Sequence, residues 1–406
     1  MSAILEGIKI LDLTRVIAGP MCTQILADMG ATVYKIEKPG EGDDTRRMGP
    51  FLQDPATGQP SNDSALYLAY NRGKHSVTVD IATPEGAQLV RDLALRCDVV
   101  VENYKVGSLA KYGLDEASLR SLKPELIYCS VTGFGQTGPY APKPAYDFIL
   151  QGLAGPMSTC GLPDDQPGGG PMRTAIPMTD MVTGLYATIG ILGALMHRQK
   201  TGEGQAIDAA MLDATVAFNG HLAVGYLMSG QAPQRVGNTN PIASPSEVFD
   251  CADGLIIIAA GNNGQFQQLC AVLGAPDMPA DPRFATNMQR IAHRSELRGA
   301  LQALVRNRSR AQLLQQLSEA SVPAGPINDM AQVFADPQTQ HRHMVVELPH
   351  SSGQTVRVVR SPLNWSASPV THKPPPRLGE HSLQTLREEL GLTDAQVKGL
   401  VARGVV

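Results

Sequence analysis

The sequence predicts an α/β fold with a largely parallel sheet. Short apolar runs rich in β-branched residues recur through the first third of the chain, namely GIKILDLT, ATVYKIEK, SVTVDI, CDVVVENY and LIYCSVTG. Helical patterns such as PMCTQILADMG and PEGAQLVRDLALR separate these runs, and this alternation is typical of parallel strands covered by helices. The chain has 406 residues, more than a single core usually contains. We therefore expect two domains or one large α/β unit with an insertion.

The order of these patterns divides the chain into four parts. Residues 1–200 hold the alternating strands and helices, which we assign to a large domain. Residues 201–240 are expected to form a linker. Residues 241–330 are expected to form a smaller domain, because they contain a second strand-turn-helix pattern, GLIIIAAGNNGQFQQLCAVLG. Residues 331–406 add the strand-like runs MVVELPH and QTVRVV and a short helix around 383–390.

Composition and charge exclude several classes of partner. The formal net charge is -4 and the isoelectric point lies near 6.1, which argues against a nucleic-acid-binding surface. Glu6, Lys9 and Asp12 interrupt the apolar residues of the N-terminus, so it does not match a signal peptide. We expect no later apolar run to span a membrane. The sequence therefore predicts a soluble, cytoplasmic protein with neither a membrane nor a nucleic acid as partner.

The cysteines and histidines do not predict a metal site. The six cysteines lie far apart, without a C-x-x-C pair, and the nine histidines include no H-E-x-x-H motif. We therefore expect reduced, mostly buried thiols and no bound metal.

A single acid, Asp180, stands before an apolar segment in AIPMTDMVTGLYATIGILGAL. The segment predicts a helix from about 180 to 198, and small residues recur along one face of it, at Gly184, Ala187, Gly190 and Gly193. One interpretation is that Thr179 or Asp180 caps this helix. The other is that the helix start keeps the carboxylate ionised in apolar surroundings, as a nucleophile requires. The pattern alone does not choose between them.

The run GFGQTG, at 133–138, matches the G-x-G-x-x-G pattern of dinucleotide-binding folds. Pro139, Pro142 and Pro144 follow at once and prevent the helix whose N-terminus would receive the pyrophosphate. An acid about twenty residues further on is also missing. A dinucleotide site is therefore not expected here.

Several cations cluster beside predicted strands. They are Lys38, Arg72, Lys74, His75, Lys105 and Lys111. Each is an ordinary surface charge when taken alone, but open parallel sheets bind ligands beyond the carboxyl ends of their strands. These cations therefore favour a phosphorylated cofactor. The turn in AAGNNGQF is either a second anion-binding element, formed by its backbone N–H groups, or an ordinary connection.

Taken together, the motifs resemble the class III CoA-transferases over nearly the whole chain. The matching segments are RVIAGPMCTQILADMGATVYKIEKPGEGDDTR, YNRGKHSVTVDI, VVENYKVGSLAKYGL, VTGFGQTGPYA, MTDMVTGLYATIGILGAL and QKTGEGQAID. The resemblance implies a large Rossmann-like parallel-sheet domain built from both chain ends, to which 331–406 return after a linker. It further implies a smaller inserted α/β domain and a homodimer of two interlocked, ring-like chains.

The resemblance also implies a covalent mechanism. Asp180 matches the nucleophile of the family, which attacks the thioester of an acyl-CoA donor and gives an aspartyl acyl anhydride and a CoA thiolate. The thiolate returns to form an aspartyl-CoA thioester, from which a carboxylic acid acceptor takes the CoA. Coenzyme A is thus expected as part of the substrates, and no metal is required.

Residues that match the family's CoA contacts are Val16, Ile17, Ala18, Lys38, Val79, Ile81, Ala82, Asn103, Tyr104, Lys111 and Tyr112. The resemblance places Tyr146 and Asp147 beside the reacting thioester, and we assign Arg72, Lys74, His75 and Lys105 to CoA as cations. Arg15, Arg47, Arg72 and Arg235 are candidates for binding a distal carboxylate of the substrate. Gly261, Asn262, Asn263 and Gly264 are candidates for stabilising an oxyanion.

Two alternatives to transfer remain open at this point. Related α-methylacyl-CoA racemases have a histidine where this chain has Tyr146, and tyrosine, with a pKa near ~10, is a poor replacement. A binding protein without catalysis, in which Asp180 only caps its helix, is the second alternative. Within the transferases, Ile17 and the GNNG turn differ from the formyl-CoA:oxalate branch. AAGNNGQF, VPAGPINDM and PPPRLGEHS look closer to the succinyl-CoA:glutarate branch.

Overall fold

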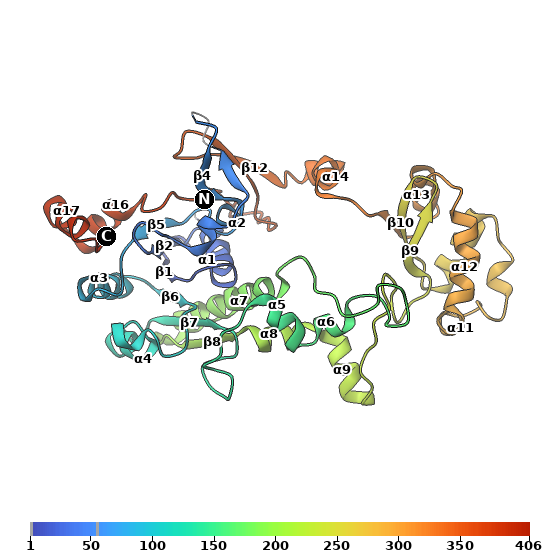
Figure 1. The fold of residues 1–406 in the computed structure, drawn as a ribbon, viewed down its shortest axis with the longest axis horizontal. Coiled ribbons are helices and arrows are strands. Elements are labelled where there is room, and N and C mark those ends of the chain that lie inside the picture. Colours follow the sequence, from blue (N-terminus) through green and yellow to red (C-terminus); the bar gives the residue numbers. More distant parts are fainter. Residues whose placement is uncertain (1–2, 54–56) are drawn as a thin grey trace. The chain divides into compact units, whose positions relative to one another are not determined.

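The computed structural model describes residues 3–53 and 57–406. The chain forms two compact units, of which the first comprises Met1–Pro156, Thr174–Gly230 and Pro337–Val406. The second comprises Met157–Arg173 and Gln231–Asp336. The blue N-terminal and red C-terminal segments in Figure 1 thus belong to the same unit.

A six-stranded parallel sheet forms the centre of the first unit, and the predicted α/β class is confirmed. Its strands are β1 (Lys9–Leu13), β2 (Thr32–Glu37), β5 (His75–Thr78), β6 (Val99–Glu102), β7 (Ile127–Thr132) and β8 (Ala206–Ala210), in the order β5-β2-β1-β6-β7-β8. Ile10 of the central strand β1 lies between Val33 and Val99. Helices cover both faces, which explains why the strands read as near-continuous apolar runs.

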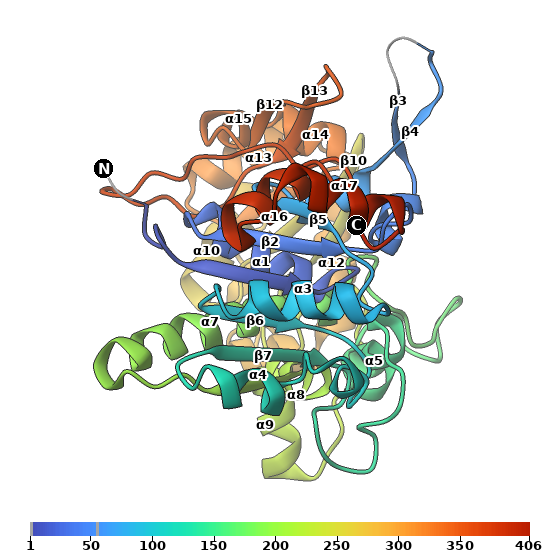
Figure 2. The same ribbon diagram turned by 90° about the vertical axis from the view of Figure 1, so that its left-hand side faces the viewer.

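Alternate residues of each strand face two separate cores. Ile10, Val99 and Val101 pack against α1 (Ala18–Asp28) and α7 (Met178–Thr201). Leu11 and Val100 point the other way, toward α3 (Pro84–Ala94) and α4 (Glu116–Leu122), which lie in front of the strands in Figure 2. The period of two residues along a strand explains this division.

The edge strand β8 was not predicted, because its sequence AIDAA lies in the segment assigned to a linker, 201–240. Alanine and aspartate are weak strand formers, so pairing with β7 determines its conformation. The helices α8 (Met211–Phe218) and α9 (Gly220–Ser229) follow it within the first unit. Conversely, 157–173, which we placed in the large domain, belong to the second unit.

The C-terminal segment completes the first unit. It contains the hairpin β12 (Val345–Pro349) and β13 (Thr355–Val359), and the helices α15 (Pro337–His341), α16 (Ser382–Leu390) and α17 (Asp394–Ala402). Glu389 accepts hydrogen bonds from Lys9 Nζ (2.7 Å) and Tyr34 Oη (2.7 Å) of the sheet. The expected strands and the helix near 383–390 are confirmed, whereas α17 was not predicted.

The same segment closes the outer edge of the sheet at β5. The N–H of His381 donates to the carbonyl of Ser76 (2.9 Å), and the N–H of Thr78 donates to Ser382 Oγ (2.9 Å). The imidazole rings of His75 and His381 stack with centroids 4.6 Å apart. Residues about 300 positions later thus supply partners that a neighbouring strand would otherwise provide.

Shorter elements of the first unit are η1 (Asp44–Arg47), β3 (Phe51–Gln53), β4 (Pro60–Ser64), α2 (Ala65–Tyr70), η2 (Ala110–Tyr112) and α5 (Asp147–Leu153), and α6 (Pro156–Thr159) lies at its boundary with the second unit.

The second unit has an antiparallel sheet of β9 (Ser246–Cys251), β10 (Gly254–Ala259) and β11 (Ala324–Pro326). Its helices are α10 (Asn263–Leu273), η3 (Met278–Ala280), α11 (Asn287–Ala292), α12 (Arg294–Val305), α13 (Arg310–Glu319) and α14 (Met330–Ala335). Phe249, Phe266 and Leu297 contribute to its separate core.

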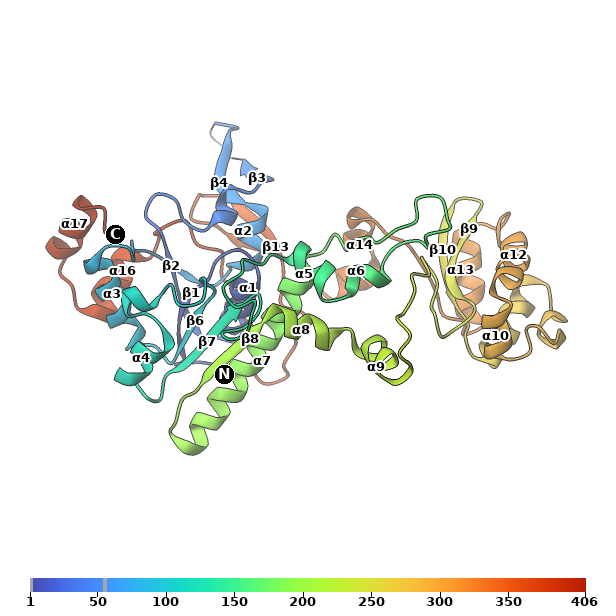
Figure 3. The same ribbon diagram turned by 60° about the horizontal axis from the view of Figure 1, so that its bottom comes forward.

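Helix α7 is long and apolar enough to cross a membrane by length and composition, contrary to our expectation from the sequence. One side of it is nevertheless part of a protein core, because Ala187 and Ile191 are fully buried against α1 and the sheet. Figure 3 shows α7 running beside β7 and β8. The other side exposes apolar residues, which are considered below.

Gly184 allows α7 to approach α1 closely. A Cβ at this position would lie 2.7 Å from the carbonyl oxygen of Ala18. The helices have little room to separate without disturbing the sheet beneath them. The small-residue face predicted from sequence therefore has a packing role at this position.

We expect Gly184→Ala to lower the free energy of unfolding by about 1–3 kcal/mol, because α1 must move away from α7. Gly193→Ala is the matched control on the same helix, since a Cβ there would meet no described atom within 4 Å outside the local backbone of α7. Its better helix propensity should raise stability by up to about 1 kcal/mol. Urea denaturation would measure both, and equal effects of the two substitutions would contradict the packing argument.

Candidate active site

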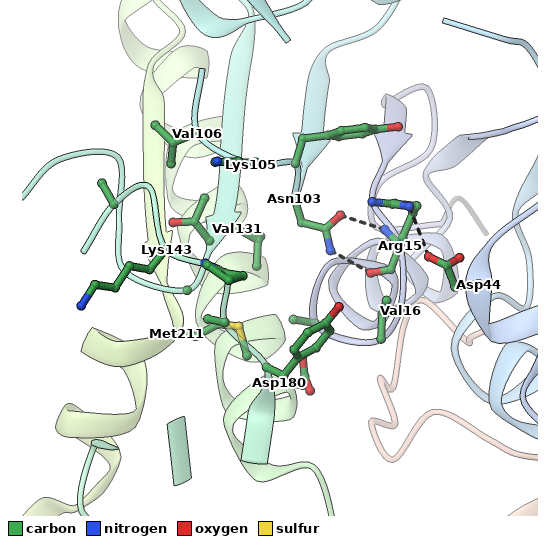
Figure 4. Close-up of a pocket in the computed structure, with 18 residues that line it drawn as sticks. Arg15, Val16, Asp44, Asn103, Lys105, Val106, Val131, Lys143, Asp180 and Met211 are labelled. Carbon is green, nitrogen blue, oxygen red and sulfur yellow. Dashed lines mark hydrogen bonds and ion pairs between the residues drawn. The ribbon is translucent and has the colours of Figure 1, made fainter. Parts of the chain in front are cut away.

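A cavity of about 400 Å³ opens at the carboxyl ends of the strands in the first unit. The chain segments that follow β1, β6 and β7 form its walls together with the start of α7 (Figure 4). Its lining includes Arg15, Val16, Ala18, Asn103, Tyr104, Lys105, Lys143, Tyr146, Asp180 and Met211. Open parallel sheets bind their ligands at this edge.

Asp180 does not cap its own helix. It lies in the first turn of α7, whose cap makes no side-chain hydrogen bond. The carboxylate of Asp147, at the start of α5, accepts hydrogen bonds from the N–H (2.8 Å) and Oγ1 (2.7 Å) of Thr179. Because Asp147 satisfies the helix start, the capping interpretation of Thr179 and Asp180 is wrong. The carboxylate of Asp180 is left facing the cavity.

Burial, and then the charge of Asp147, raise the pKa of Asp180 to about 7, while the backbone N–H of Ala18 lowers it. At neutral pH the side chain therefore exchanges readily between the acid and the carboxylate. Tyr70, at the end of α2, also lies within electrostatic reach of Asp180. A half-buried carboxylate with one nearby N–H donor is better suited to chemistry than to stability.

The N-terminus of α1 supplies that donor. Its N-cap residue Ile17 makes no side-chain cap, and the first bond within the helix runs from Met21 N–H to the Ile17 carbonyl (2.8 Å). The N–H groups of Ala18 and Gly19 precede this bond and have no helical partner. They point out of the positive end of the helix dipole, where negative charge is stabilised.

Val16, just before α1, has a backbone φ of 71°. A β-branched residue rarely adopts this left-handed conformation, which costs of order 1–3 kcal/mol. Its N–H donates to Asp43 Oδ1 (3.3 Å), and Lys35 Nζ donates to the preceding Thr14 carbonyl (2.9 Å). The turn is therefore strained, and buried side chains hold it in place.

Asp43 and Lys35 form a buried ion pair beneath this turn, with Asp43 Oδ2 2.9 Å from Lys35 Nζ. Glu37 pairs in the same way with Arg46 (2.7 Å). The roles of these four residues were not predicted, although the run IEKPGEGDDTR, which begins at the end of β2, places several charges close together. The feature that could have predicted these buried ion pairs is the high density of charged residues beside a strand that must be buried.

Three predicted CoA cations instead have structural roles. Arg72 pairs with Asp28, and its Nη1 donates to the carbonyl of Val359 (2.9 Å). Lys74 Nζ lies 3.0 Å from Asp12 Oδ2 in a fully buried pair, and His75 stacks on His381 as described above. None of the three lines this cavity. Their partners Asp28, Asp12 and His381 are distant in the sequence, which therefore does not show that these side chains are already engaged.

The electrostatics of the Asp12–Lys74 pair agree with a structural role. Burial raises the pKa of Asp12, but the charges of Lys74 and Lys35 outweigh that effect and lower it to about 2. Burial lowers the pKa of Lys74 to about 8 despite its partner. Both groups remain charged at neutral pH, and each stabilises the charged form of the other.

A second cavity, of about 360 Å³, adjoins the first and shares Arg15, Asp44 and Tyr104 with it. Lys38, Val79, Ile81, Ala82, Lys111 and Tyr112 line it. The guanidinium of Arg15 lies over the ring of Tyr104 (5.4 Å) and 3.2 Å from Asp44. Most of the predicted CoA residues thus gather around two connected cavities, with Arg15 at their junction.

The remaining arginine candidates lie elsewhere. Arg47 pairs with Asp44 (3.1 Å) and is exposed, and it lines neither of these cavities. Arg235 pairs with Asp164 within the second unit. Arg15 is the arginine of the predicted four that lines the cavity with Asp180.

The GNNG turn belongs to the second unit. Asn262 caps α10 by accepting from Gln265 N–H (2.8 Å). The buried Arg290 donates to Asn263 Oδ1 (3.0 Å) and to the Gly261 carbonyl (2.7 Å). The side chains of both asparagines thus shape the turn, and an oxyanion role for its N–H groups stays a prediction.

Across 3–53 and 57–406, no group of three His, Cys, Asp or Glu side chains could hold a metal ion.

The sequence matches the model of CoA-transferase family III over residues 5–382. The chain is a family III CoA-transferase. It is 47% identical to a succinate–glutarate CoA-transferase from Agrobacterium fabrum, with 95% of each chain covered. It is 39% identical to a human succinyl-CoA:glutarate CoA-transferase, covering 99% of this chain and 90% of the human one.

A solved structure of a CAIB/BAIF family protein from Brucella suis superimposes on the transferase with a TM-score of 0.85. The two sequences are 43% identical, and the match covers 96% of this chain and 100% of the other. The mixed α/β architecture is therefore that of the family. As a CoA-transferase, the enzyme uses CoA thioesters as substrates and carboxylates as acceptors.

Ionisation of Asp180 should lower the free energy of unfolding of the transferase. The pKa of Asp180 in the folded protein lies above its ordinary value of 3.8, so the native state holds the proton more tightly than the unfolded chain. The penalty is small below about pH 4, grows as pH rises, and is complete above about 7. We expect Asp180→Asn to stabilise the protein at pH 8 by up to about 4 kcal/mol, and by much less at pH 4.5.

Chemical denaturation at the two pH values would measure this difference. Asp165→Asn, at an exposed acid of the second unit, is the control and should change stability little at either pH. An Asp180→Asn variant that is equally stabilised at both pH values would contradict the raised pKa.

Proposed function

We propose that this transferase moves CoA from succinyl-CoA to glutarate or another small dicarboxylate through covalent intermediates on Asp180. The identity to the two glutarate CoA-transferases supports this substrate class. The observation that carries the mechanism is the position of Asp180: a half-buried carboxylate that does not cap its own helix, facing a cavity at the N-terminus of α1.

The donor would occupy both cavities. The adenine and phosphates would lie in the second cavity, among Val79, Ala82, Lys38 and Lys111. The pantetheine would pass Arg15 and Tyr104, which line both spaces, and bring the thioester to Asp180. Lys105 and Lys143 line the first cavity as further cations, and they are available for the distal carboxylate of the acid.

In the first half-reaction, a carboxylate oxygen of Asp180 attacks the thioester carbonyl of succinyl-CoA. The carbon–sulfur bond breaks, and the electron pair leaves with the CoA thiolate, which gives a mixed anhydride. The thiolate then attacks the aspartyl carbonyl carbon. Succinate leaves as a carboxylate, and Asp180 remains bound to CoA as a thioester.

In the second half-reaction, the acceptor carboxylate attacks this aspartyl thioester and releases the thiolate again. The thiolate then attacks the acceptor carbonyl of the new anhydride, which forms the product thioester and restores the carboxylate of Asp180. Each step passes through a tetrahedral oxyanion. The N–H groups of Ala18 and Gly19 are suited to stabilise the oxyanions that form on the aspartyl carbon.

Because burial and Asp147 raise the pKa of Asp180 to about 7, only part of the free enzyme carries the nucleophile at neutral pH. The ionised form is the reactive one. We therefore expect kcat/KM for succinyl-CoA to rise with pH through about 7 and to level off above it.

The direct test is to trap the intermediate. Wild type incubated with succinyl-CoA alone should gain the mass of CoA less one water, and adding glutarate should remove that mass and yield glutaryl-CoA. Asp180→Asn should show neither change, a loss of at least about 10⁴-fold in transfer. Malate, itaconate and acetate in the same assay would define the acceptor class.

Binding of succinyl-CoA to Asp180→Asn, measured by calorimetry, is the control for folding. Transfer that survives in this variant would refute the proposal. Exchange of the α-hydrogen of a 2-methylacyl-CoA with solvent deuterium, in the absence of transfer, would indicate a racemase instead. Binding without either reaction would indicate a CoA-binding protein.

We also infer that a second copy of the chain covers the apolar face of the first unit, giving the interlocked homodimer implied by the family. Exposed apolar residues gather on α5, α7, α8 and α9: Phe148, Ile149, Leu153, Leu185, Tyr186, Ile189, Met196, Phe218, Leu227 and Met228. Leu227 and Met228 are 79% and 84% exposed. A surface of this kind is typical of a permanent interface.

Ile189→Arg, in the middle of this face, should convert the dimer to monomer or aggregate, because it places a charge in an apolar interface. Leu122→Arg, at an exposed leucine of α4 beyond the opposite face of the sheet, is the control and should leave the dimer intact. Analytical ultracentrifugation would measure both. A monomeric wild type, or binding of the wild type to lipid vesicles through α7, would refute the dimer.

A further inference from the structure

Asn103 makes two hydrogen bonds to the main chain of one residue. Its Oδ1 accepts from the N–H of Arg15 (2.9 Å), and its Nδ2 donates to the carbonyl of Arg15 (2.7 Å). Figure 4 shows both bonds at the wall of the cavity. The C=O and NH₂ groups of the side-chain amide thus each bond within the protein, whereas the family resemblance places Asn103 among the CoA contacts.

The position of Asn103 explains this arrangement. Strands β1 and β6 pair in parallel as far as Leu13 and Glu102. Beyond that point the chain after β1 turns away toward α1, and the backbone of β6 no longer reaches it. The amide of Asn103, the first residue after β6, continues the ladder by supplying one donor and one acceptor to Arg15.

Arg15 directly precedes the strained residue Val16, and Ala18 follows two positions later. A left-handed valine persists only where its surroundings fix the chain on both sides. Asp43 binds the N–H of Val16 from one side (3.3 Å), and Asn103 fixes Arg15 from the other. The direction in which α1 starts, and hence the position of the Ala18 N–H beside Asp180, depends on these contacts.

We propose that Asn103 is a positioning residue, whose side-chain amide holds the turn that presents the Ala18 N–H to the carboxylate of Asp180. Its effect on catalysis rests on the proposed function of Asp180. Its effect on the ionisation of Asp180 does not depend on that function, so the experiment measures catalysis and ionisation separately.

Other groups also act on Asp180 and must stay unchanged in the test. Asp147 on α5 and Tyr70 on α2 lie nearest in electrostatic terms. The charged residues that line the same cavity are Arg15, Asp44, Lys105 and Lys143. Asn103→Ala adds and removes no charge, so any change in the ionisation of Asp180 must come from the turn.

We expect Asn103→Ala to lower kcat by about 10²-fold, because displacing a donor by about 1 Å has effects of this size. KM for succinyl-CoA should change less than about threefold. The midpoint of the pH–rate profile should move upward, because the ionised form of Asp180 loses its N–H donor. Val106→Ala, three residues further on in the wall of the same cavity, is the uncharged control and should leave the midpoint in place.

A second measurement does not depend on turnover. The stability difference between each protein and its Asp180→Asn version, followed from pH 4.5 to 9, reports the pKa of Asp180 in the wild type and in Asn103→Ala. If Asn103→Ala folds poorly, the pair of measurements is made in a Val16→Gly background, since glycine adopts a φ of 71° without strain.

A higher midpoint for Asp180 in the Asn103→Ala background supports the positioning role, even if no CoA transfer is found with any acid. An unchanged midpoint, with a raised KM for succinyl-CoA and normal kcat, would overturn it and make Asn103 a CoA ligand. If the wild type transfers no CoA, the proposed function is refuted. The pKa of Asp180 obtained from the stability measurement remains valid in that case.

Discussion

The buried ammonium group of Lys35 determines how the functional part of this protein is arranged. It donates to the carbonyl of Thr14 and to the carboxylate of Asp43, both at 2.9 Å, in a region closed to solvent. Asp43 in turn binds the turn before α1 and the start of η1. Losing either charge would leave the other buried and unpaired, which costs about 3–5 kcal/mol. Two chain segments that line the cavities are thus fixed by one ion pair.

Two carboxylates with opposite effects on stability meet at the start of α7. Asp147 is needed as a carboxylate, because it satisfies the helix start through Thr179. The same charge raises the pKa of Asp180 and makes its ionisation unfavourable. An alanine at either position would relieve this repulsion, but it would remove either the helix cap or the carboxylate that faces the cavity. Functional sites commonly retain such unfavourable pairs.

The sequence was most informative where a residue type has few physical roles. Alternating apolar runs predicted the parallel sheet, and a lone acid before an apolar helix drew attention to Asp180 without deciding between a helix cap and a nucleophile. It was least informative where tertiary pairing decides the outcome, as in the alanine-rich strand β8. The cations Arg72 and Lys74 were misassigned because their acidic partners, Asp28 and Asp12, lie far away in the sequence. The strain at Val16 and the amide of Asn103 depend on backbone geometry, for which the sequence carries no local signal.

The closure of β5 by the C-terminal segment has a consequence for biosynthesis. While the chain is being made, β5 has an open edge until Ser382 and its neighbours leave the ribosome, about 300 residues later. The N–H of Asp80, just beyond the strand, donates to the carbonyl of Val405 (2.8 Å), which is made later still. The edge of β5 therefore stays open until these distant residues have been synthesised. A nascent chain that does not yet include Ser382 exposes this strand edge, at which other chains can pair and aggregate.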